Sequence, residues 1–356
     1  MIRFIQAIIF VATVVACNSN NKTTYLPKAT GKPGDIILFM DSVQWKGALG
    51  DELRKVFEAD VPGLPQQEPM FKLICIQPIN GKTLLTQIRN LVYVFTLDQQ
   101  TIGSKSLRRN FSRETLQKIK TDSSFYLSTK IDEFSKGQHV MYLFGDTQQN
   151  LINHLKRNKQ NIIDYFNVVE NNRLKSNLLK TSSTNGVSAF LRAEQQCEIH
   201  VPLGFRLADK RDDFAWFREI NPNMDKDIFI SMKPYTDEKQ LSTDSLIAWR
   251  DRIAKKYLFE DPSNPISYLV TEQTNASVLA RKMKLNNHYA IELRGLWRTN
   301  HHSMGGAFLS YTLIDEPRGL LYYIEGFAYA PGKDKREIMR ELETVLSTFK
   351  TSDELK

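Results

Sequence analysis

The chain has 356 residues, 41% of them hydrophobic and 25% charged, which is the composition of an ordinary folded protein. Its net charge of +8 is the small difference between 48 basic and 40 acidic side chains. We interpret the strongest basic stretch, between Lys105 and Lys120, as the solvated face of a helix, and we expect no nucleic-acid partner. A positive skew also suits a protein that works beside anionic lipid headgroups.

The amino terminus has the pattern of an export signal. A short positive start is followed by an apolar run from Phe4 to Ala16, which is too short to span a bilayer as a helix. Val14-Val15-Ala16-Cys17 resembles a bacterial lipobox, in which the cysteine is acylated and the leader is removed; Val14 stands where leucine is common. We predict a signal peptide at 1–16 and a palmitate-type lipid on Cys17. An ordinary secretory leader is the alternative.

Residues 17–34 are predicted to be a lipidated tether, because they are polar and include Pro27 and Pro33. Where Asp-based retention rules hold, Asn18 does not keep a lipoprotein in the inner membrane. The acidic cluster that some bacteria place after the cysteine for surface display is missing. The expected location is the outer membrane, on the side that faces the periplasm. The membrane itself is one expected partner, through the lipid on Cys17.

The first half of the folded body alternates apolar strands with helical patterns. The pattern predicts, in chain order, a strand at 35–40, a helix capped by Asp41 that ends near Pro62, strands at 71–77 and 91–97 around a helix near 82–89, a basic helix near 112–120, a strand pair at 125–131 and 139–145, and a long helix at 148–180.

The polar run from Thr181 to Gly186 interrupts the chain, and the second half contains more strands. The pattern predicts a short helix at 187–195, strands at 198–202 and 228–232, a helix capped by Asp244, strands at 267–272, 277–283, 288–298, 307–314 and 320–329, and a closing amphipathic helix at 334–349.

We therefore predict an α+β protein with an N-terminal lobe at 35–180, a connection at 181–196 and a C-terminal lobe at 197–352. Each lobe is expected to be a mainly antiparallel sheet with packed helices. Consecutive strands joined by short turns indicate that the C-terminal lobe is a meander closed by the amphipathic helix, with its helices on one face.

Two cysteines remain after Cys17. Cys75 and Cys197 lie in apolar strand patterns and are predicted to be buried free thiols, with a disulfide between them as the alternative. The sequence contains no CxxC or Cys/His spacing typical of a metal site, so neither a metal nor a cofactor is expected.

Several motifs of the second half are distinctive in combination. They are Glu292-Leu293-Arg294-Gly295-Leu296-Trp297, Met304-Gly305-Gly306-Ala307-Phe308 and Glu325-Gly326-Phe327-Ala328-Tyr329-Ala330-Pro331. With Asp35–Met40 they resemble the Bacteroidota lipoprotein family called domain of unknown function 4837, over almost the whole mature chain; Ala307 departs from the proline expected there. The resemblance implies an envelope lipoprotein without an assigned chemistry. The terminal meander and helix also resemble PsbP-type proteins in fold, which does not imply function.

Familiar catalytic signatures are missing from the sequence, and no catalytic residue is assigned. Strand alternation places Arg294 and Arg298 on one face and Trp297 on the other. The two arginines could line a cleft for an anionic ligand. The alternative is a charge ladder on a solvated sheet face, with Trp297 in the core.

The loop that follows is a second candidate for ligand binding. His301 and His302 could act as bases or metal ligands, but adjacent histidines on an extended chain point in opposite directions, which favours a solvated turn. Met304, Gly305 and Gly306 form either a tight turn or a mobile binding loop.

Three functions are consistent with these features. The first is a non-enzymatic envelope lipoprotein that binds another envelope component, in particular a protein. The second is a periplasmic carrier or sensor of a small amphipathic or anionic ligand, bound around Arg294, Trp297 and Arg298. The third is a hydrolase with an unfamiliar site near His301 or His302.

Overall fold

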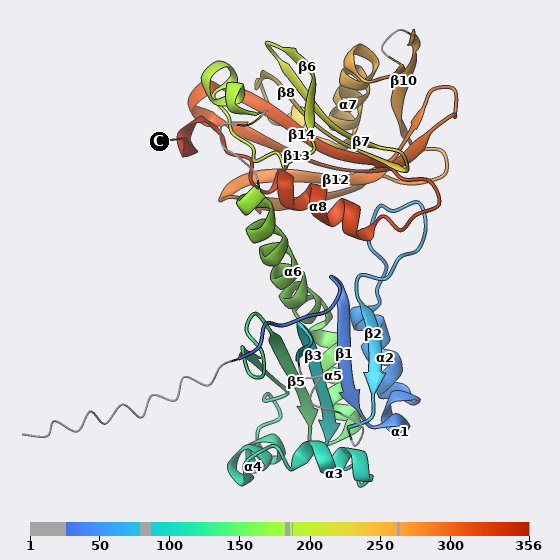
Figure 1. The fold of residues 1–356 in the computed structure, drawn as a ribbon, viewed down its shortest axis with the longest axis vertical. Helices are drawn as coiled ribbons and strands as arrows, with labels where there is room; N and C mark the ends of the chain where they lie inside the picture. The colour runs from blue at the N-terminus through green and yellow to red at the C-terminus, as the bar shows by residue number, and fades with distance from the viewer. Residues whose placement is uncertain (1–25, 79–86, 182–185, 187, 262–263, 356) are drawn as a thin grey trace, which may run out of the picture.

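The computed structural model describes residues 26–78, 87–181, 186, 188–261 and 264–355. The predicted signal peptide, the first half of the tether with Cys17, and most of the predicted helix near 82–89 lie outside them. The described strands form two sheets, one in each lobe, and helix α6 (Lys159–Thr181) runs between the lobes (Figure 1). The α+β class is confirmed. In the described part of the chain, no helix is both long and apolar enough to cross a bilayer.

The sheet of the N-terminal lobe has the strand order β2-β1-β3-β5-β4. Strand β1 is parallel to β2 and β3, and β3 is parallel to β5; only the pairing of β4 with β5 is antiparallel among the described strands. The prediction of a mainly antiparallel sheet is therefore wrong for this lobe. The strands are β1 (Asp35–Met40), β2 (Lys72–Ile76), β3 (Asn90–Thr96), β4 (Leu127–Ile131) and β5 (His139–Gly145).

Helices cover both faces of this sheet, which explains why β1 and β3 are apolar along almost their whole length. One face packs against α2, α5 and α6, and the other packs against α3 and α4. The predicted helix at 148–180 is two helices separated at Asn158. Asp41 caps α1, since its carboxylate accepts a hydrogen bond from the Val43 amide. The helices are α1 (Ser42–Trp45), α2 (Ala48–Phe57), α3 (Ile102–Arg108), α4 (Arg113–Thr121) and α5 (Gln148–Arg157).

The end of the predicted tether lies against this lobe. Lys28 and Thr30 form isolated parallel bridges with Lys136 and Ile88, two residues that precede β5 and β3. The described chain therefore enters the lobe at the edge of the sheet where its parallel strands begin.

The sheet of the C-terminal lobe has the order β6-β7-β8-β14-β13-β12-β10-β9, and β11 pairs with β12 beside β10. These pairings are antiparallel, as predicted. The predicted strand at 198–202 is only an isolated bridge of Glu198 with Lys350. The strands are β6 (Arg206–Arg211), β7 (Phe214–Asn221), β8 (Met224–Pro234), β9 (Phe259–Asp261), β10 (Asn264–Glu272), β11 (Leu279–Leu285), β12 (His288–Thr299), β13 (Gly305–Asp315) and β14 (Leu320–Tyr329).

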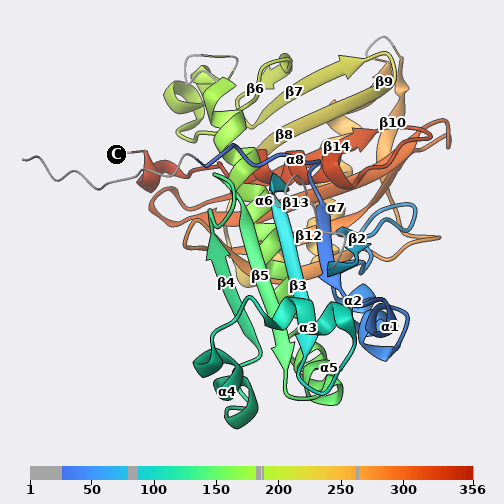
Figure 2. The same cartoon turned by 60° about the horizontal axis from the view of Figure 1, so that its bottom comes forward.

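Helices α7 (Thr243–Tyr257) and α8 (Arg336–Leu346) pack on opposite faces of this sheet, so the prediction of helices on one face is wrong. Figures 1 and 2 show α8 on the side of the N-terminal lobe. Ser242, rather than Asp244, caps α7. Short helical turns lie at Leu191–Gln195, Glu238–Leu241, Glu316–Arg318 and Ser352–Glu354.

A fully buried ion pair connects α7 with strand β14 of the sheet. The guanidinium of Arg250 donates to both carboxylate oxygens of Glu325 on β14, at 2.8–3.2 Å, and both side chains are 0% exposed. The hydroxyl of Tyr323 also donates to Glu325, at 2.7 Å, and Arg250 donates to Thr271. Burial raises the pKa of Glu325, and Arg250 opposes that shift.

Replacement of Glu325 by glutamine is expected to lower the free energy of unfolding by roughly 3–5 kcal/mol, because the buried Arg250 loses its two-oxygen counter-charge and keeps only the longer contact with the partly exposed Asp251, at 3.7 Å. The double variant Arg250→Met, Glu325→Leu removes both charges and is expected to recover most of that loss. Urea-induced unfolding followed by circular dichroism measures both effects. A double variant no more stable than the single one would contradict the expectation.

Candidate functional site

A loop of the N-terminal lobe, residues 59–71 between α2 and β2, reaches the C-terminal lobe. At Gly63, whose φ is +78°, an added Cβ would lie 2.8 Å from Cβ of Arg294 on β12. The backbone of the loop therefore rests directly on that strand, at a distance that only glycine permits. Next to it, the side chain of Leu64 packs against the core of the C-terminal lobe.

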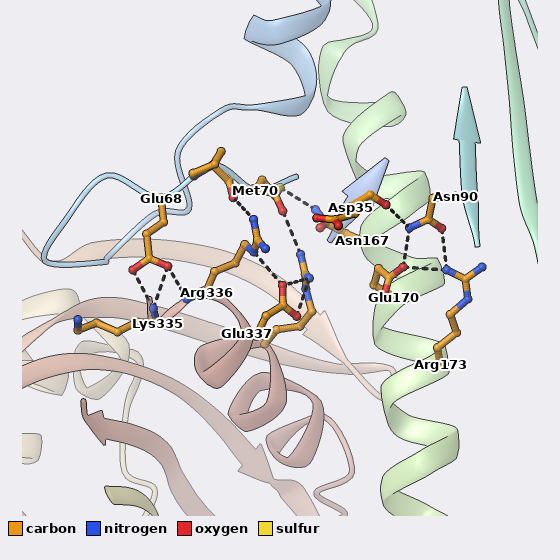
Figure 3. A network of polar contacts seen from close by, with 12 residues as sticks. Asp35, Glu68, Met70, Asn90, Asn167, Glu170, Arg173, Lys335, Arg336 and Glu337 are labelled. Carbon is orange, nitrogen blue, oxygen red and sulfur yellow. Dashed lines mark hydrogen bonds and ion pairs between the residues drawn. The ribbon is translucent and has the colours of Figure 1, made fainter. Parts of the chain in front are cut away.

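The same loop caps α8 across the interface between the lobes. The buried carboxylate of Glu68 accepts hydrogen bonds from the backbone amides of Lys335, at 2.8 Å, and Arg336, at 2.7 Å (Figure 3). A carboxylate at this position satisfies amides that have no partner within the helix and interacts favourably with the helix dipole. Glu68 therefore joins the lobes by capping the N-terminus of α8, a role that a residue next to the helix in sequence usually has.

Two arginines of α8 donate hydrogen bonds to backbone carbonyls of the loop. Arg336 donates to the carbonyl of Pro69 at 2.8 Å, and Arg340 donates to the carbonyl of Met70 at 3.3 Å. Glu337 accepts from both guanidinium groups at 2.8 Å and so holds them in position (Figure 3).

Helix α6 is fixed to the N-terminal lobe by a second network in Figure 3. Glu170, which is 2% exposed, accepts from Asn90 of β3 and from Arg173, both at 2.7 Å. Arg89 forms an ion pair with the same carboxylate at 2.8 Å. Asn167, one turn earlier, donates to the sulfur of Met70 at 3.0 Å. Helix α6 and the loop therefore belong to one unit, which faces α8.

A cleft of about 720 Å³ lies between the lobes. The loop and α6 form one wall, and the start of β11, β12 and α8 form the other. Two of its lining side chains are apolar and exposed to solvent: Val168 of α6 is 57% exposed and Leu279 of β11 is 47% exposed. Apolar side chains left open on facing walls are typical of a surface that binds something.

The arginines on the β-strands of the cleft are already paired. Arg294 donates to Glu292 at 3.1 Å and to Glu343 of α8 at 2.8 Å, and Arg281 donates to Glu292 at 3.2 Å. Burial alone would lower the pKa of Arg294, but Glu343 and Glu292 outweigh it and raise that pKa. The pairs stay charged, so Arg294 positions the cleft wall and does not present an unpaired cation to an anionic ligand.

The structure does not bring Arg294, Trp297 and Arg298 into one cleft. Arg298 lies beyond the cleft lining and pairs with Glu272 of β10 at 2.7 Å. Trp297 points to the opposite face of the sheet, where it is 3% exposed and its ring packs edge-on against Phe327. Among the three, Arg294 alone lines the cleft.

The loop between β12 and β13 is also separate from the cleft lining. His301 and His302 are exposed, and the ring of His301 lies 3.3 Å from the side chain of Asn300. Met304 packs against the core on the side of α7. At Gly306 an added Cβ would lie 1.9 Å from the Ala328 carbonyl, and at Gly305 it would lie 3.0 Å from that of Trp297, so close packing of the strands accounts for both glycines.

Neither cysteine in the described residues forms a disulfide. Cys197 is buried and Cys75 is half-buried, and burial raises their pKa to about 12 and about 11, so both remain protonated thiols. The described residues contain one group with possible metal-ligand spacing, His288 with Asp353 and Glu354, at 3.8 and 3.3 Å. The carboxylate of Glu354 also accepts from the amide of Thr351.

Apart from Arg294, the residues that build this cleft were not predicted from the sequence. Pro62–Pro65 looked only like the end of a helix, and Glu68 had no pattern that linked it to α8. Neither Val168 nor Leu279 by itself predicts a binding site, because single exposed apolar side chains are common on any protein.

Replacement of Glu68 by alanine is expected to lower the free energy of unfolding by about 1–3 kcal/mol, since two buried amides lose their charged acceptor. Hydrogen exchange at the Lys335 and Arg336 amides should accelerate in the same variant. The neighbouring substitution Gln67→Ala removes only an exposed contact with Asp60 within the same loop and serves as the control. Unchanged exchange at both amides would show that Glu68 does not hold the helix.

Comparison with known proteins yields two family matches and distant likenesses to solved structures. No curated protein matches the chain. The Ran-binding protein Mog1p of Saccharomyces cerevisiae has a TM-score of 0.31 and 8% identity, over 44% of this chain and 90% of that chain. Another Mog1 structure, of a mutant, has a TM-score of 0.29 and 8% identity, over 44% and 91%. The likeness to PsbP-type proteins stays a prediction.

The family matches divide the chain between its lobes. Residues 186–348 match the family described as Domain of unknown function (DUF4837), which confirms the resemblance inferred from the motifs of the second half. Residues 29–179 match a different family, Domain of unknown function (DUF8532), so the resemblance does not extend over the N-terminal lobe as expected. Each lobe is thus similar to a different family of unknown function.

Proposed function

We propose that this protein is a lipid-anchored envelope protein that binds an extended segment of another envelope protein in the cleft between its lobes, without carrying out a reaction. The observation that carries the proposal is the cleft itself, which has exposed apolar side chains on both walls and a strand edge beside it. Clefts between domains are a preferred position for binding sites.

The strand edge is that of β11, whose first three residues, Leu279 to Arg281, line the cleft. In the described part of the chain β11 pairs with β12 on one side, and its other side has no strand partner. An unpaired edge offers backbone amides and carbonyls to an incoming extended chain, which can add to the sheet as a further strand. This supports a protein segment as the occupant.

Side chains along β11 indicate the chemistry of that segment. Lys282 and Lys284 are exposed on the face of the strand opposite Leu279 and Arg281, by strand alternation. Opposite charges on neighbouring strands stabilise their pairing. A segment with acidic side chains on that face and apolar ones toward Val168 fits this surface best.

The envelope location rests on the lipobox-like Val14-Val15-Ala16-Cys17. We extend the proposal to lipidation at Cys17 and to the periplasmic face of the outer membrane. Loss of the protein from the membrane fraction in a Cys17→Ala variant tests the anchor separately from the cleft.

A small amphipathic ligand is the second candidate, because the cleft volume of about 720 Å³ falls within the range of ligand pockets. The pairing of Arg294 with Glu292 and Glu343 makes a purely anionic ligand a poor fit. A rise in the melting temperature on addition of envelope lipid extract, lost in a Leu279→Glu variant, would favour this candidate over a protein segment.

In-cell photocrosslinking provides the test of a protein partner. A photoreactive amino acid at Leu279 or Val168 is expected to capture one dominant protein, the same from both positions, because both side chains face the cleft and are exposed. The matched positions Val43 and Ile266, which are 61% and 70% exposed and lie outside the cleft lining, should not capture it.

Leu279→Glu is combined with the crosslinker at Val168, and Val168→Glu with the crosslinker at Leu279. Each substitution should reduce capture of the partner at least tenfold, because a buried unpaired charge costs well over 1.4 kcal/mol. Equal capture from the cleft and from Val43 would reject the cleft as the binding site, even if the Cys17 anchor is real.

A further inference from the structure

A second surface differs from the cleft in charge and position. It is a groove of about 680 Å³ between α3 and α4, which we call the α3–α4 groove. Its cations are Lys105, Arg108, Arg109, Arg113 and Lys120, and no carboxylate lines it. Its apolar floor is formed by Leu97, Phe111 and Leu116.

Helix periodicity directs these side chains toward one another. Lys105 and Arg109 follow Ile102 by three and seven residues, so they share one face of α3. Arg113, Leu116 and Lys120 are related in the same way on α4. Ile102 is 75% exposed, which adds a projecting apolar side chain beside the cations.

The cations of the groove lack the counter-charges that neutralise the cleft. Among the described residues, none of the five has a carboxylate within salt-bridge distance, whereas Arg281 and Arg294 in the cleft each pair with Glu292. Arg108 donates to the carbonyls of Leu97 and Gln99, at 2.8 and 2.9 Å, and so fixes α3 to the end of β3. Like charges gathered without partners favour an anionic surface as the occupant.

We propose that the α3–α4 groove binds the anionic phospholipid headgroups of the membrane to which the chain is anchored. Long exposed cations around apolar side chains are the features by which a folded surface adsorbs to anionic lipid. The groove is lined mainly by exposed side chains, whereas a pocket for a small ligand encloses most of its occupant.

The length of the tether allows this contact. The described chain begins at Leu26, near the edge of the sheet where β3 starts. Helices α3 and α4, whose residues line the groove, lie at the edge where β3 ends (Figure 1). The seven residues of β3 span about 23 Å. The nine residue steps from Cys17 to Leu26 extend to about 30 Å, which is enough to run the length of the sheet.

The proposed contact also orients the whole protein. Helices α3 and α4 lie at the end of the N-terminal lobe farthest from the C-terminal lobe (Figure 1). With the groove on the membrane, the C-terminal lobe and the cleft point away from the lipid, where a partner can reach them.

The test uses the full protein purified from membranes and reconstituted into vesicles of phosphatidylcholine alone, or of phosphatidylcholine and phosphatidylglycerol in equal parts. A fluorescent amino acid at Gln117, in the groove, reports contact with headgroups that carry a quencher. We expect quenching on the anionic vesicles only, and its loss at high salt. The same reporter at Lys239, in the C-terminal lobe, should stay unquenched.

The triple variant Arg109→Gln, Arg113→Gln, Lys120→Gln is expected to weaken the docked state about a hundredfold, because each cation near an anionic surface contributes roughly fivefold. The control Arg206→Gln, Arg252→Gln, Lys255→Gln removes the same charge from exposed positions of the C-terminal lobe outside the cleft and should leave quenching unchanged.

Three outcomes would overturn the proposal. They are equal quenching on neutral vesicles, equal quenching in the triple variant, and displacement from the vesicles by a single-stranded oligonucleotide at the same salt concentration. None of them bears on the crosslinking result for the cleft, so the two proposals fail or stand separately.

Discussion

The arrangement of the two lobes depends on one carboxylate, that of Glu68 at the N-terminus of α8. Its transfer from water into the interface is costly, and two backbone amides and the dipole of an eleven-residue helix offset that cost. Helix α8 in turn packs on the sheet that contains β12. Whatever holds the first turn of α8 therefore sets the distance between α6 and β11, and hence the width of the cleft.

Much of the fold was accessible from hydrophobic patterning. Strands β8 and β10 to β14 and the closing helix were predicted because the alternation of the strands and the 3.6-residue period of the helix are strong, whereas β6, β7 and β9 were not predicted. The parallel direction of the N-terminal strands was not predicted, because an apolar strand has the same local pattern in either direction. The uninterrupted apolar runs of β1 and β3 were the available signal, since they indicate strands that are covered on both faces.

The candidate site was less accessible, because its contacts join residues far apart in the chain. Arg294 was singled out by strand alternation, but its partner Glu343 comes from α8, and no sequence pattern links the two. Trp297 and Arg298 are its neighbours in sequence, yet one faces the opposite core and the other pairs outside the cleft. Adjacency along a strand predicts the face of a side chain but not which distant segment covers it.

In the described part of the chain, the lobes are joined where the backbone continues from α6, through the loop that carries Gly63 and Glu68, and where α6 packs against α8. Contacts at three separate places oppose a hinge motion about any one of them. The cleft is therefore preorganised, and a partner does not have to supply the free energy of a closing motion. For such a site, differences in affinity among related partners should come mainly from the dissociation rate constant rather than from the association rate constant.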